Sequence, residues 1–142
     1  TFLGMMVSGF PNLLMPSGPQ SGSASTNYPR GIENGVDWCT ELLEYMWERD
    51  LTYLEATEEA EKRWTDHVVK MYSVMLMRKA QSWFTGYNSN VEGHEAGKVR
   101  YMVYNGGTPK YVASIGEVAS KDYEGIRFAA GAKDSDELLV AD

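Results

Sequence analysis

The stretch "PRGIENGVDWCTELLEYMWER", Pro29 to Arg49, decides the fold class of this chain. Its apolar residues recur at spacings of four, three, four and three, which is the period of one face of an α-helix. That face holds Ile32, Val36, Cys39, Leu43 and Met46. Three large apolar residues, Trp38, Leu42 and Trp47, widen the stripe. The pattern predicts a well-buried helix over about residues 29–49.

Gly35 stands inside this apolar stripe. A glycine in a helix interior costs about 1 kcal/mol relative to alanine. We therefore expect another surface to pass close to the helix backbone at this position. The chain also has more apolar helix face than three helices can cover among themselves, so we expect part of its partner surface to lie outside it.

A long loop of small residues precedes the helix. It reads "SGPQSGSASTNYP", Ser17 to Pro29, and holds four Ser, two Gly and two Pro. A simple turn needs only about two to five residues. The start of a helix exposes unpaired N–H groups and a partial positive charge, which suit an anion or a carbonyl oxygen. The loop predicts either a ligand-facing helix start or a plain capped helix after a flexible loop.

Other segments predict strands and a tail. "FPNLLMP", residues 10–16, is short and apolar between prolines, which favours a buried strand. "LTYLEA", residues 51–56, is typical of a strand or an extended connector, and "GIRFAA", residues 125–130, of a last strand. The acidic residues 131–142 are expected to form a flexible tail.

Two further helices are expected. Thr57 is a good N-cap, and the two glutamates after it favour the first turn of a helix that runs to about Leu76. Its core face is predicted to hold Ala60, Trp64, Val68, Met71 and Met75. A third helix is expected over Tyr111 to Ser120. The predicted fold class is α/β and helix-rich.

Composition excludes several classes of protein. The 142 residues, 43% of them hydrophobic, suffice for one compact domain with a core. A net charge of −7 without a basic run excludes nucleic acid as a main partner. No apolar run approaches the roughly 20 residues of a membrane span. The single Cys39 excludes an internal disulfide and favours a reducing compartment, so we expect a cytoplasmic protein. The absence of an initiator Met suggests a piece of a larger chain.

Motifs for catalysis or metal binding are absent. His67 and His94 are the only histidines, and they match no metal-ligand spacing, so no metal site is predicted. No nucleophile elbow or glycine-rich phosphate motif occurs, and no catalytic residue is assigned. Trp83, in "QSWFTGYN", is either a core tryptophan or an indole donor on a mobile loop over a ligand.

Six ordered segments resemble the C-terminal part of Baeyer–Villiger monooxygenases, the cyclohexanone and phenylacetone monooxygenase group. They cover roughly residues 3–128. The segments are "GFPNLLMPSGP", "STN" at 25–27, "EATEEAEKRWTDHV" at 55–68, "SWFTGYN", "YNGGTPKY" and "YEGI", in the family's order, with the first read as strand and loop. "SNVEGHEAGK" is longer than the equivalent stretch in better-known members, which leaves the shape of residues 89–98 open.

The resemblance implies an enzyme that uses FAD and NADPH to insert one oxygen of O2 beside a ketone carbonyl, giving an ester or lactone. The family's dinucleotide fingerprints and active-site arginine lie N-terminal to such a region, so the chain alone is expected to be inactive. It would be the C-terminal segment of a flavoprotein with two dinucleotide-binding domains. Residues 1–50 would end the FAD domain, and residues 51–130 would form a C-terminal helical segment with a control loop at 81–98.

The resemblance also implies roles for individual residues. Thr26, Asn27 and Tyr28 would present backbone N–H groups to the flavin, and Trp83 would contact the nicotinamide cofactor. Ser25, Thr26, Tyr28 and Val103 would border the substrate pocket. The implied partners are a ketone, O2 and the N-terminal remainder of the enzyme, with self-association of the isolated chain. Two alternatives stay open: a flavin monooxygenase that oxidises sulfur or nitrogen, and a non-enzymatic helical interaction module.

Overall fold

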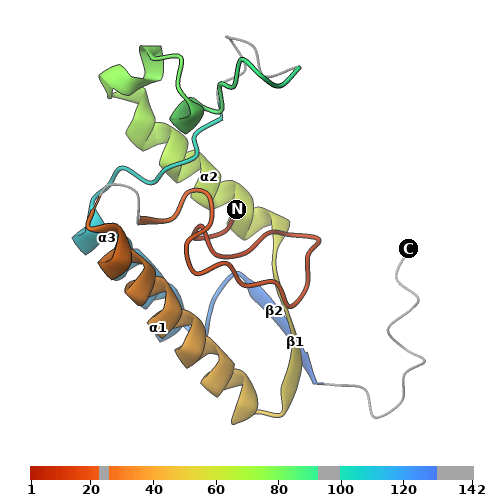
Figure 1. Ribbon diagram of the computed structural model, residues 1–142. Coiled ribbons are helices and arrows are strands. Elements are labelled where there is room, and N and C mark those ends of the chain that lie inside the picture. Colours follow the sequence, from red (N-terminus) through yellow and green to blue (C-terminus); the bar gives the residue numbers. More distant parts are fainter. Residues whose placement is uncertain (23–25, 93–99, 131–142) are drawn as a thin grey trace.

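The computed structural model describes residues 1–22, 26–92 and 100–130 (Figure 1). The main elements are α1 (Tyr28–Trp47), β1 (Leu51–Ala56), α2 (Glu58–Ser73), α3 (Thr108–Ser120) and β2 (Ile126–Ala130). Two short 3₁₀ helices, η2 (Leu76–Lys79) and η3 (Trp83–Thr85), follow α2. The predicted helix-rich α/β class is therefore confirmed at the level of elements.

Helix α1 begins and ends close to the predicted bounds, but its buried face is not the predicted one. The residues that face the core are Gly31, Gly35, Trp38, Cys39, Leu42 and Met46. Val36 and Leu43 are exposed, and Trp47 is 86% exposed. Since α3 and β1 contact α1 from one side only, the second apolar face has no cover within the described residues. The prediction that Val36, Leu43 and Trp47 lie on the buried face of this helix is wrong for this chain.

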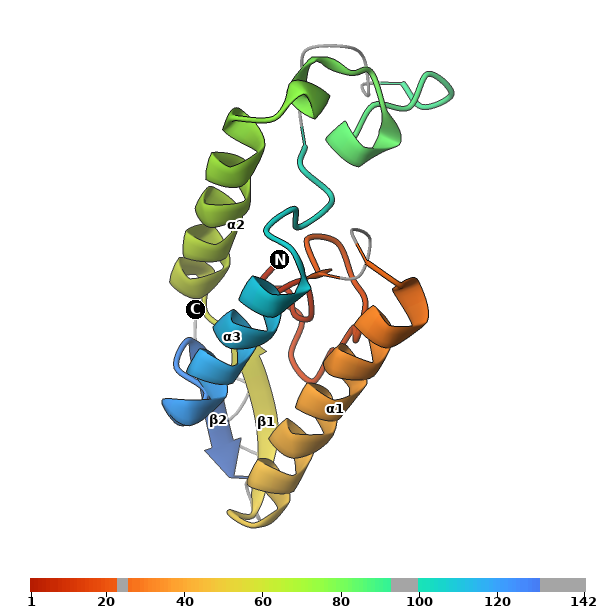
Figure 2. The same ribbon diagram turned by 90° about the vertical axis from the view of Figure 1, so that its left-hand side faces the viewer.

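The close approach expected at Gly35 is confirmed. A Cβ atom at this position would overlap the carbonyl oxygen of Pro16. The approaching backbone belongs to the chain's own N-terminal loop, which lies between α1 and α2 in both views (Figures 1 and 2). Glycine is required here because no side chain fits between the helix and Pro16.

Residues 10–16 do not form the predicted buried strand. Phe10 and Leu13 are exposed, and Asn12 has a positive φ of 58° that turns the chain. The Asn12 N–H donates to the Leu54 carbonyl at 2.9 Å, and the Leu54 N–H donates to Asn12 Oδ1 at 3.0 Å. The segment is a loop that is attached to β1 at one residue, because its prolines supply no N–H for a ladder.

Helix α2 starts as predicted and ends earlier. The Ala60 N–H donates to the Thr57 hydroxyl at 3.2 Å, which confirms Thr57 as the N-cap. The helix stops at Ser73, and Tyr72 takes the buried position that the sequence pattern assigns to Met71 and Met75. Helix α3 begins three residues before the predicted start, after Gly107 with a positive φ of 81°.

The two predicted strands pair with each other. β1 and β2 run antiparallel, with Leu54 opposite Phe128. This two-stranded sheet packs beside the second half of α1, where the Tyr45 ring lies 5.5 Å from the Phe128 ring. Neither strand carries a sequence signal for its partner, since about 70 residues separate them and each is predicted from its own composition.

The core lies where α1, α2 and α3 meet the N-terminal segment (Figure 2). The Trp38 indole on α1 donates to the Ile115 carbonyl on α3 at 2.9 Å. The buried Tyr111 hydroxyl donates to the Leu3 carbonyl at 2.8 Å. Residues 76–92 form a lobe at the far end of α2 (Figure 1), and its Met77 and Phe84 side chains pack against the core cluster. In the part of the chain that is described, no helix has both the length and the apolar character that a membrane crossing needs.

Candidate functional site

The start of α1 presents one group of predicted site residues. Asn27 is the N-cap: its side chain accepts from the Arg30 N–H at 3.4 Å, and its carbonyl accepts from the Gly31 N–H at 2.9 Å. Tyr28 is half exposed, and its hydroxyl accepts from the Ser17 hydroxyl at 3.2 Å. Among the described residues, no acceptor lies within hydrogen-bond range of the Tyr28 N–H. The Tyr28 N–H is thus one of the first N–H groups of α1, which have no acceptor within the helix.

The predicted pocket residues differ in their placement. Ser25 lies outside the described residues. Val103 is buried in the core, 4% exposed, next to Tyr104. Thr26 is partly exposed at the entrance to α1. In this chain Val103 therefore packs inward, while Thr26 and Tyr28 face outward.

Trp83 lies on a well-defined turn of the lobe. Ser82 caps η3 by accepting from the Phe84 N–H at 3.3 Å, and Gly86 ends it with a positive φ of 76°. The Trp83 ring stacks on the Phe84 ring at 4.3 Å between centroids, and the residue is 64% exposed. This exposure excludes the interpretation of Trp83 as a core tryptophan within the described structure.

The four tryptophans divide into two kinds by their indole N–H groups. Trp38 donates to the Ile115 carbonyl, and Trp64 donates to the Gln20 carbonyl at 3.3 Å. Both are buried. Trp47 and Trp83 are exposed, and their indole nitrogens have no acceptor within the described ranges. Trp83 thus presents both an apolar ring and a donor to the surface.

Residues 100–104, here called the strap, connect the Trp83 turn to the N-terminal loop. The strap donates from the Arg100 N–H to the Thr85 carbonyl at 2.8 Å and from the Met102 N–H to the Phe84 carbonyl at 3.0 Å. The Met102 carbonyl in turn accepts from the Gln20 N–H at 2.8 Å. These bonds attach the Trp83 turn and Gln20, in the loop before α1, to the same stretch of chain, and the sequence carries no signal for this connection.

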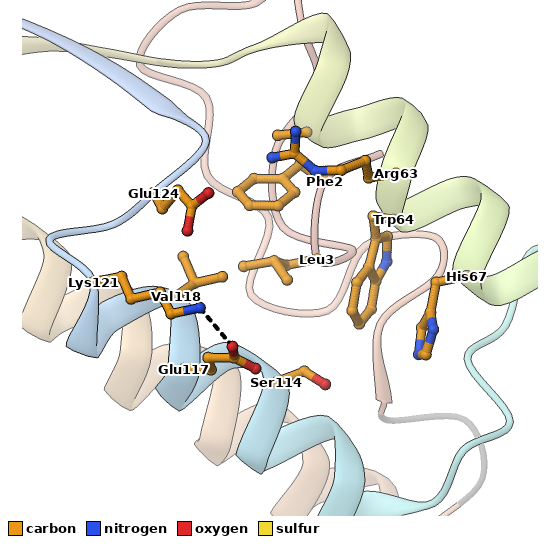
Figure 3. A pocket seen from close by; sticks show the side chains of 11 residues that line it. Phe2, Leu3, Arg63, Trp64, His67, Ser114, Glu117, Val118, Lys121 and Glu124 are labelled. Atoms are coloured by element: carbon orange, nitrogen blue, oxygen red, sulfur yellow. Dashed lines mark hydrogen bonds and ion pairs between the residues drawn. The ribbon is translucent and has the colours of Figure 1, made fainter.

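A separate hollow lies between α2 and α3 (Figure 3). It encloses about 250 Å³, with Phe2, Leu3 and Trp64 among its apolar lining residues. Its rim carries the ion pair between Lys121 Nζ and Glu117 Oε1, 2.7 Å apart. None of the predicted site residues lines this hollow. His67, at its edge, is exposed on α2 beside Trp64, as expected for a surface histidine.

Two groups with shifted pKa values lie in the core and in the sheet. Burial raises the pKa of the Cys39 thiol to about 11, so the thiol stays protonated and unreactive at neutral pH. The pKa of Glu55 is lowered by hydrogen bonds from the Tyr53 hydroxyl and the Gly9 N–H. Among the described residues, no cluster of three or more His, Cys, Asp or Glu has the arrangement of a metal site. The arrangement at α1 and Trp83 suits binding rather than proton transfer.

Comparisons with known proteins decide the family. The chain is 33% identical over 130 residues to the cyclopentanone 1,2-monooxygenase of Comamonas sp., covering 92% of this chain and 23% of that protein. A solved structure of cyclohexanone monooxygenase from Rhodococcus sp. Phi1 bound to NADP+ matches 92% of the chain with a TM-score of 0.81 and 28% identity, covering 23% of that structure. The chain belongs to the Baeyer–Villiger monooxygenases.

This membership confirms the resemblance that the ordered segments showed, and the fold class that it implied. A structure of an OTEMO complex with FAD and NADP also matches 91% of the chain, with a TM-score of 0.77 and 31% identity, over 22% of that structure. No family model matches the chain. The chain spans about 22% of the length of the curated Baeyer–Villiger relatives that it matches.

One relative of this segment is named for a different reaction. The phenazine N-monooxygenase PhzNO1 of Lysobacter antibioticus is 37% identical over 125 residues, which is 88% of this chain and 22% of that protein. Its name describes oxidation at nitrogen rather than at a ketone. Family membership therefore leaves the chemical class of the substrate to be argued from other observations.

Proposed function

We propose that this chain is the cofactor-bordering C-terminal segment of a Baeyer–Villiger monooxygenase that converts a ketone to an ester or lactone. One observation carries the proposal: the strap is hydrogen-bonded to the Trp83 turn on one side and to Gln20 and Ser21, in the loop before α1, on the other. The Trp83 turn and the start of α1 both match motifs of the family. When bound, FAD and NADPH supply the oxygenation of the ketone by O2. The segment itself would bind and orient these cofactors and the ketone.

The start of α1 would hold the flavin edge. A helix of 20 residues places a partial positive charge at its N-terminus, where an anion or a carbonyl oxygen is stabilised. Asn27 caps the first turn, in which the Tyr28 N–H has no acceptor within the helix. Thr26, Asn27 and Tyr28 thus fit one edge of FAD, and Ser25, Thr26 and Tyr28 would border the ketone. Val103 is buried in the core of the described chain, so it would border the ketone only from beneath this surface.

Trp83 would bind the nicotinamide cofactor. Its exposed ring and its indole N–H suit a ribose. A ribose hydroxyl can accept a hydrogen bond from the indole, and the carbon face of the sugar can pack on the aromatic ring. The proposed control loop is residues 81–98. Residues 1–50 would complete the FAD domain, and residues 51–130 would form the C-terminal helical part of the enzyme.

The remainder of the polypeptide is proposed to cover the outer face of α1. Val36, Leu43 and Trp47 form an exposed apolar row at helical spacing on this face. The curated relatives are more than four times as long as the matched stretch, so the whole protein has ample surface for this contact. In the isolated chain, the same row would drive self-association. The buried, reduced Cys39 supports a cytoplasmic location for the enzyme.

Oxidation of a heteroatom is the second candidate function. The 37% identity to the phenazine N-monooxygenase favours it as much as the 33% identities favour ketone oxidation. A non-enzymatic interaction module is the third, because this chain by itself carries only one edge of a cofactor site.

Product analysis of the full-length enzyme tests the proposal. Purified enzyme with FAD, NADPH and O2 is given cyclohexanone, a thioether and phenazine in separate reactions. We expect a lactone from cyclohexanone, with NADPH consumption matched to product. An N-oxide or sulfoxide without lactone would select the second candidate. A full-length protein that contains no flavin would select the interaction module.

A further inference from the structure

Thr85 is a buried residue in a lobe whose other residues are exposed or only partly buried. The residue is 5% exposed, and its hydroxyl lies 2.7 Å from the Ser82 carbonyl and 3.1 Å from the Ala80 carbonyl. With one proton it donates to one of these oxygens, while it accepts from the Ser82 N–H at 3.4 Å. The Thr85 hydroxyl therefore ties the end of η3 to the backbone of Ala80 and Ser82 just before it.

The backbone of the same residue holds the strap. The Thr85 carbonyl accepts from the Arg100 N–H, and the neighbouring Phe84 carbonyl accepts from the Met102 N–H. Both carbonyls point toward the strap only while η3 keeps its shape. The hydroxyl bonds of Thr85 thus fix the two acceptors that the strap requires.

The other end of the strap is attached to a rigid part of the core. The Gln20 N–H donates to the Met102 carbonyl, and the Gln20 carbonyl accepts from the buried Trp64 indole. A Cβ on Gly4 would overlap the Ser21 backbone, so this loop is packed without free space. Since Gln20 and Ser21 lead directly into the loop before α1, the strap relates the Trp83 turn to that loop.

We infer that Thr85 is a positioning residue: its buried hydroxyl shapes the Trp83 turn so that the strap holds Trp83 at a fixed place relative to the loop that leads to α1. The inference rests on the proposed cofactor contacts of Trp83 and of the α1 start. Trp83 touches the nicotinamide cofactor, and Thr85 acts only through Trp83. Thr85 itself is buried, whereas Trp83 is exposed.

The test compares three variants of the full-length enzyme. Thr85→Val removes the hydroxyl and keeps the shape, Thr85→Ser keeps the hydroxyl, and Thr52→Val makes the same change on an exposed position of β1. In Thr85→Val we expect the Arg100 and Met102 amides to exchange with solvent about tenfold faster, because a lost buried hydrogen bond loosens the turn. The dissociation constant for NADP+ should rise about tenfold, with normal FAD content. Thr85→Ser and Thr52→Val should behave as the unchanged enzyme.

A Thr85→Val enzyme with a lowered melting temperature but unchanged amide exchange and NADP+ affinity would overturn the inference, because Thr85 would then be only structural. Trp83→Phe separates this failure from a failure of the proposed function. If Trp83→Phe weakens NADP+ binding and Thr85→Val does not, only the positioning role fails. If Trp83→Phe binds NADP+ normally, the proposed contact of Trp83 fails, and with it this role of Thr85.

Discussion

The Trp64 indole stacks on the Tyr104 ring, with centroids 5.3 Å apart and planes only 6° from parallel. This stack joins the middle of α2 to the end of the strap. Trp64 also donates to the Gln20 carbonyl, so one buried side chain contacts both ends of the connection between the strap and the N-terminal loop.

Replacement of Trp64 should destabilise the chain strongly. Trp64→Ala leaves a cavity beside Tyr104 and an unpaired Gln20 carbonyl, and a buried tryptophan replaced by alanine costs about 3–5 kcal/mol. Urea unfolding of the isolated chain measures this loss. Trp47→Ala is the matched control, because Trp47 is 86% exposed and its loss should cost less than about 0.5 kcal/mol. Equal losses in the two variants would contradict the described core.

Two glycines in helices should respond in opposite directions to alanine. Gly35→Ala forces a Cβ against the Pro16 carbonyl oxygen, which outweighs the gain of about 1 kcal/mol in helix propensity. Gly116 lies in α3 with open space around the position of its missing Cβ, so Gly116→Ala should stabilise the chain by up to about 1 kcal/mol. Thermal melts of both variants check the prediction. A stabilised Gly35→Ala would show that the N-terminal loop does not lie against α1.

The Glu55 carboxylate should make stability depend on acid pH. Its pKa is lowered by hydrogen bonds from the Tyr53 hydroxyl and the Gly9 N–H, with a further contribution from Arg127 at 2.8 Å. A carboxyl whose pKa is lower in the folded state stabilises the fold above its unfolded pKa of about 4.3 and loses this contribution as pH falls through the folded pKa. Urea midpoints between neutral pH and pH of about 3 measure the loss.

Glu55→Gln should flatten this pH profile and cost about 1.5–3 kcal/mol at neutral pH, the range for hydrogen bonds to a charged group. Glu117→Gln is the control: this side chain is 66% exposed and pairs with Lys121 at the surface, where solvent screens the pair, so the profile should keep its shape. An unchanged profile in Glu55→Gln would mean that other carboxyls cause the loss of folding stability at acid pH.

Trp83→Ala in the full-length enzyme should lower ketone oxygenation about tenfold or more, equivalent to about 1.4 kcal/mol of transition-state stabilisation. Because Trp83 is 64% exposed, the melting temperature and the flavin content should stay unchanged. Turnover per bound flavin, measured beside the melting temperature, checks this. Normal turnover with a lowered melting point would show that Trp83 has only a structural role.

The outer face of α1 should control association of the isolated chain. Leu43→Glu places a charge in the exposed row with Val36 and Trp47, so it should shift the chain from self-associated to monomeric without loss of folding. Glu41→Gln, also exposed on α1, is the control and should leave association unchanged. Sedimentation velocity measures the state. A monomeric unaltered chain at high concentration would argue against an interaction surface on this face.

The sequence by itself determined the existence and limits of most elements. The period of apolar residues from 32 to 46 and Thr57 before α2 are signals that act within four or five residues, so they can be read locally. The family motifs at "STN" and "SWFTGYN" are local in the same sense, and they mark the two segments of the candidate site from residue identity alone.

Tertiary structure alone decided which apolar face of α1 is buried. Val36, Leu43 and Trp47 are as hydrophobic as the residues that face the core, so local pattern could not rank the two faces. The choice depends on the Pro16 backbone against Gly35 and on α3 beside Trp38. The failed strand at residues 10–16 has the same cause, because its attachment to Leu54 depends on a distant partner.

The same distinction between local sequence and tertiary structure applies to the candidate site. Sequence indicated Trp83 and the α1 start separately and left Trp83 open between core and surface. The exposure of Trp83 is visible only in the folded chain. The strap is held by backbone hydrogen bonds from the Met102 N–H to Phe84 and from the Gln20 N–H to Met102. Backbone N–H and C=O groups are the same at almost every residue, so their long-range pairing leaves no mark on the side chains and is decided only when the whole chain packs.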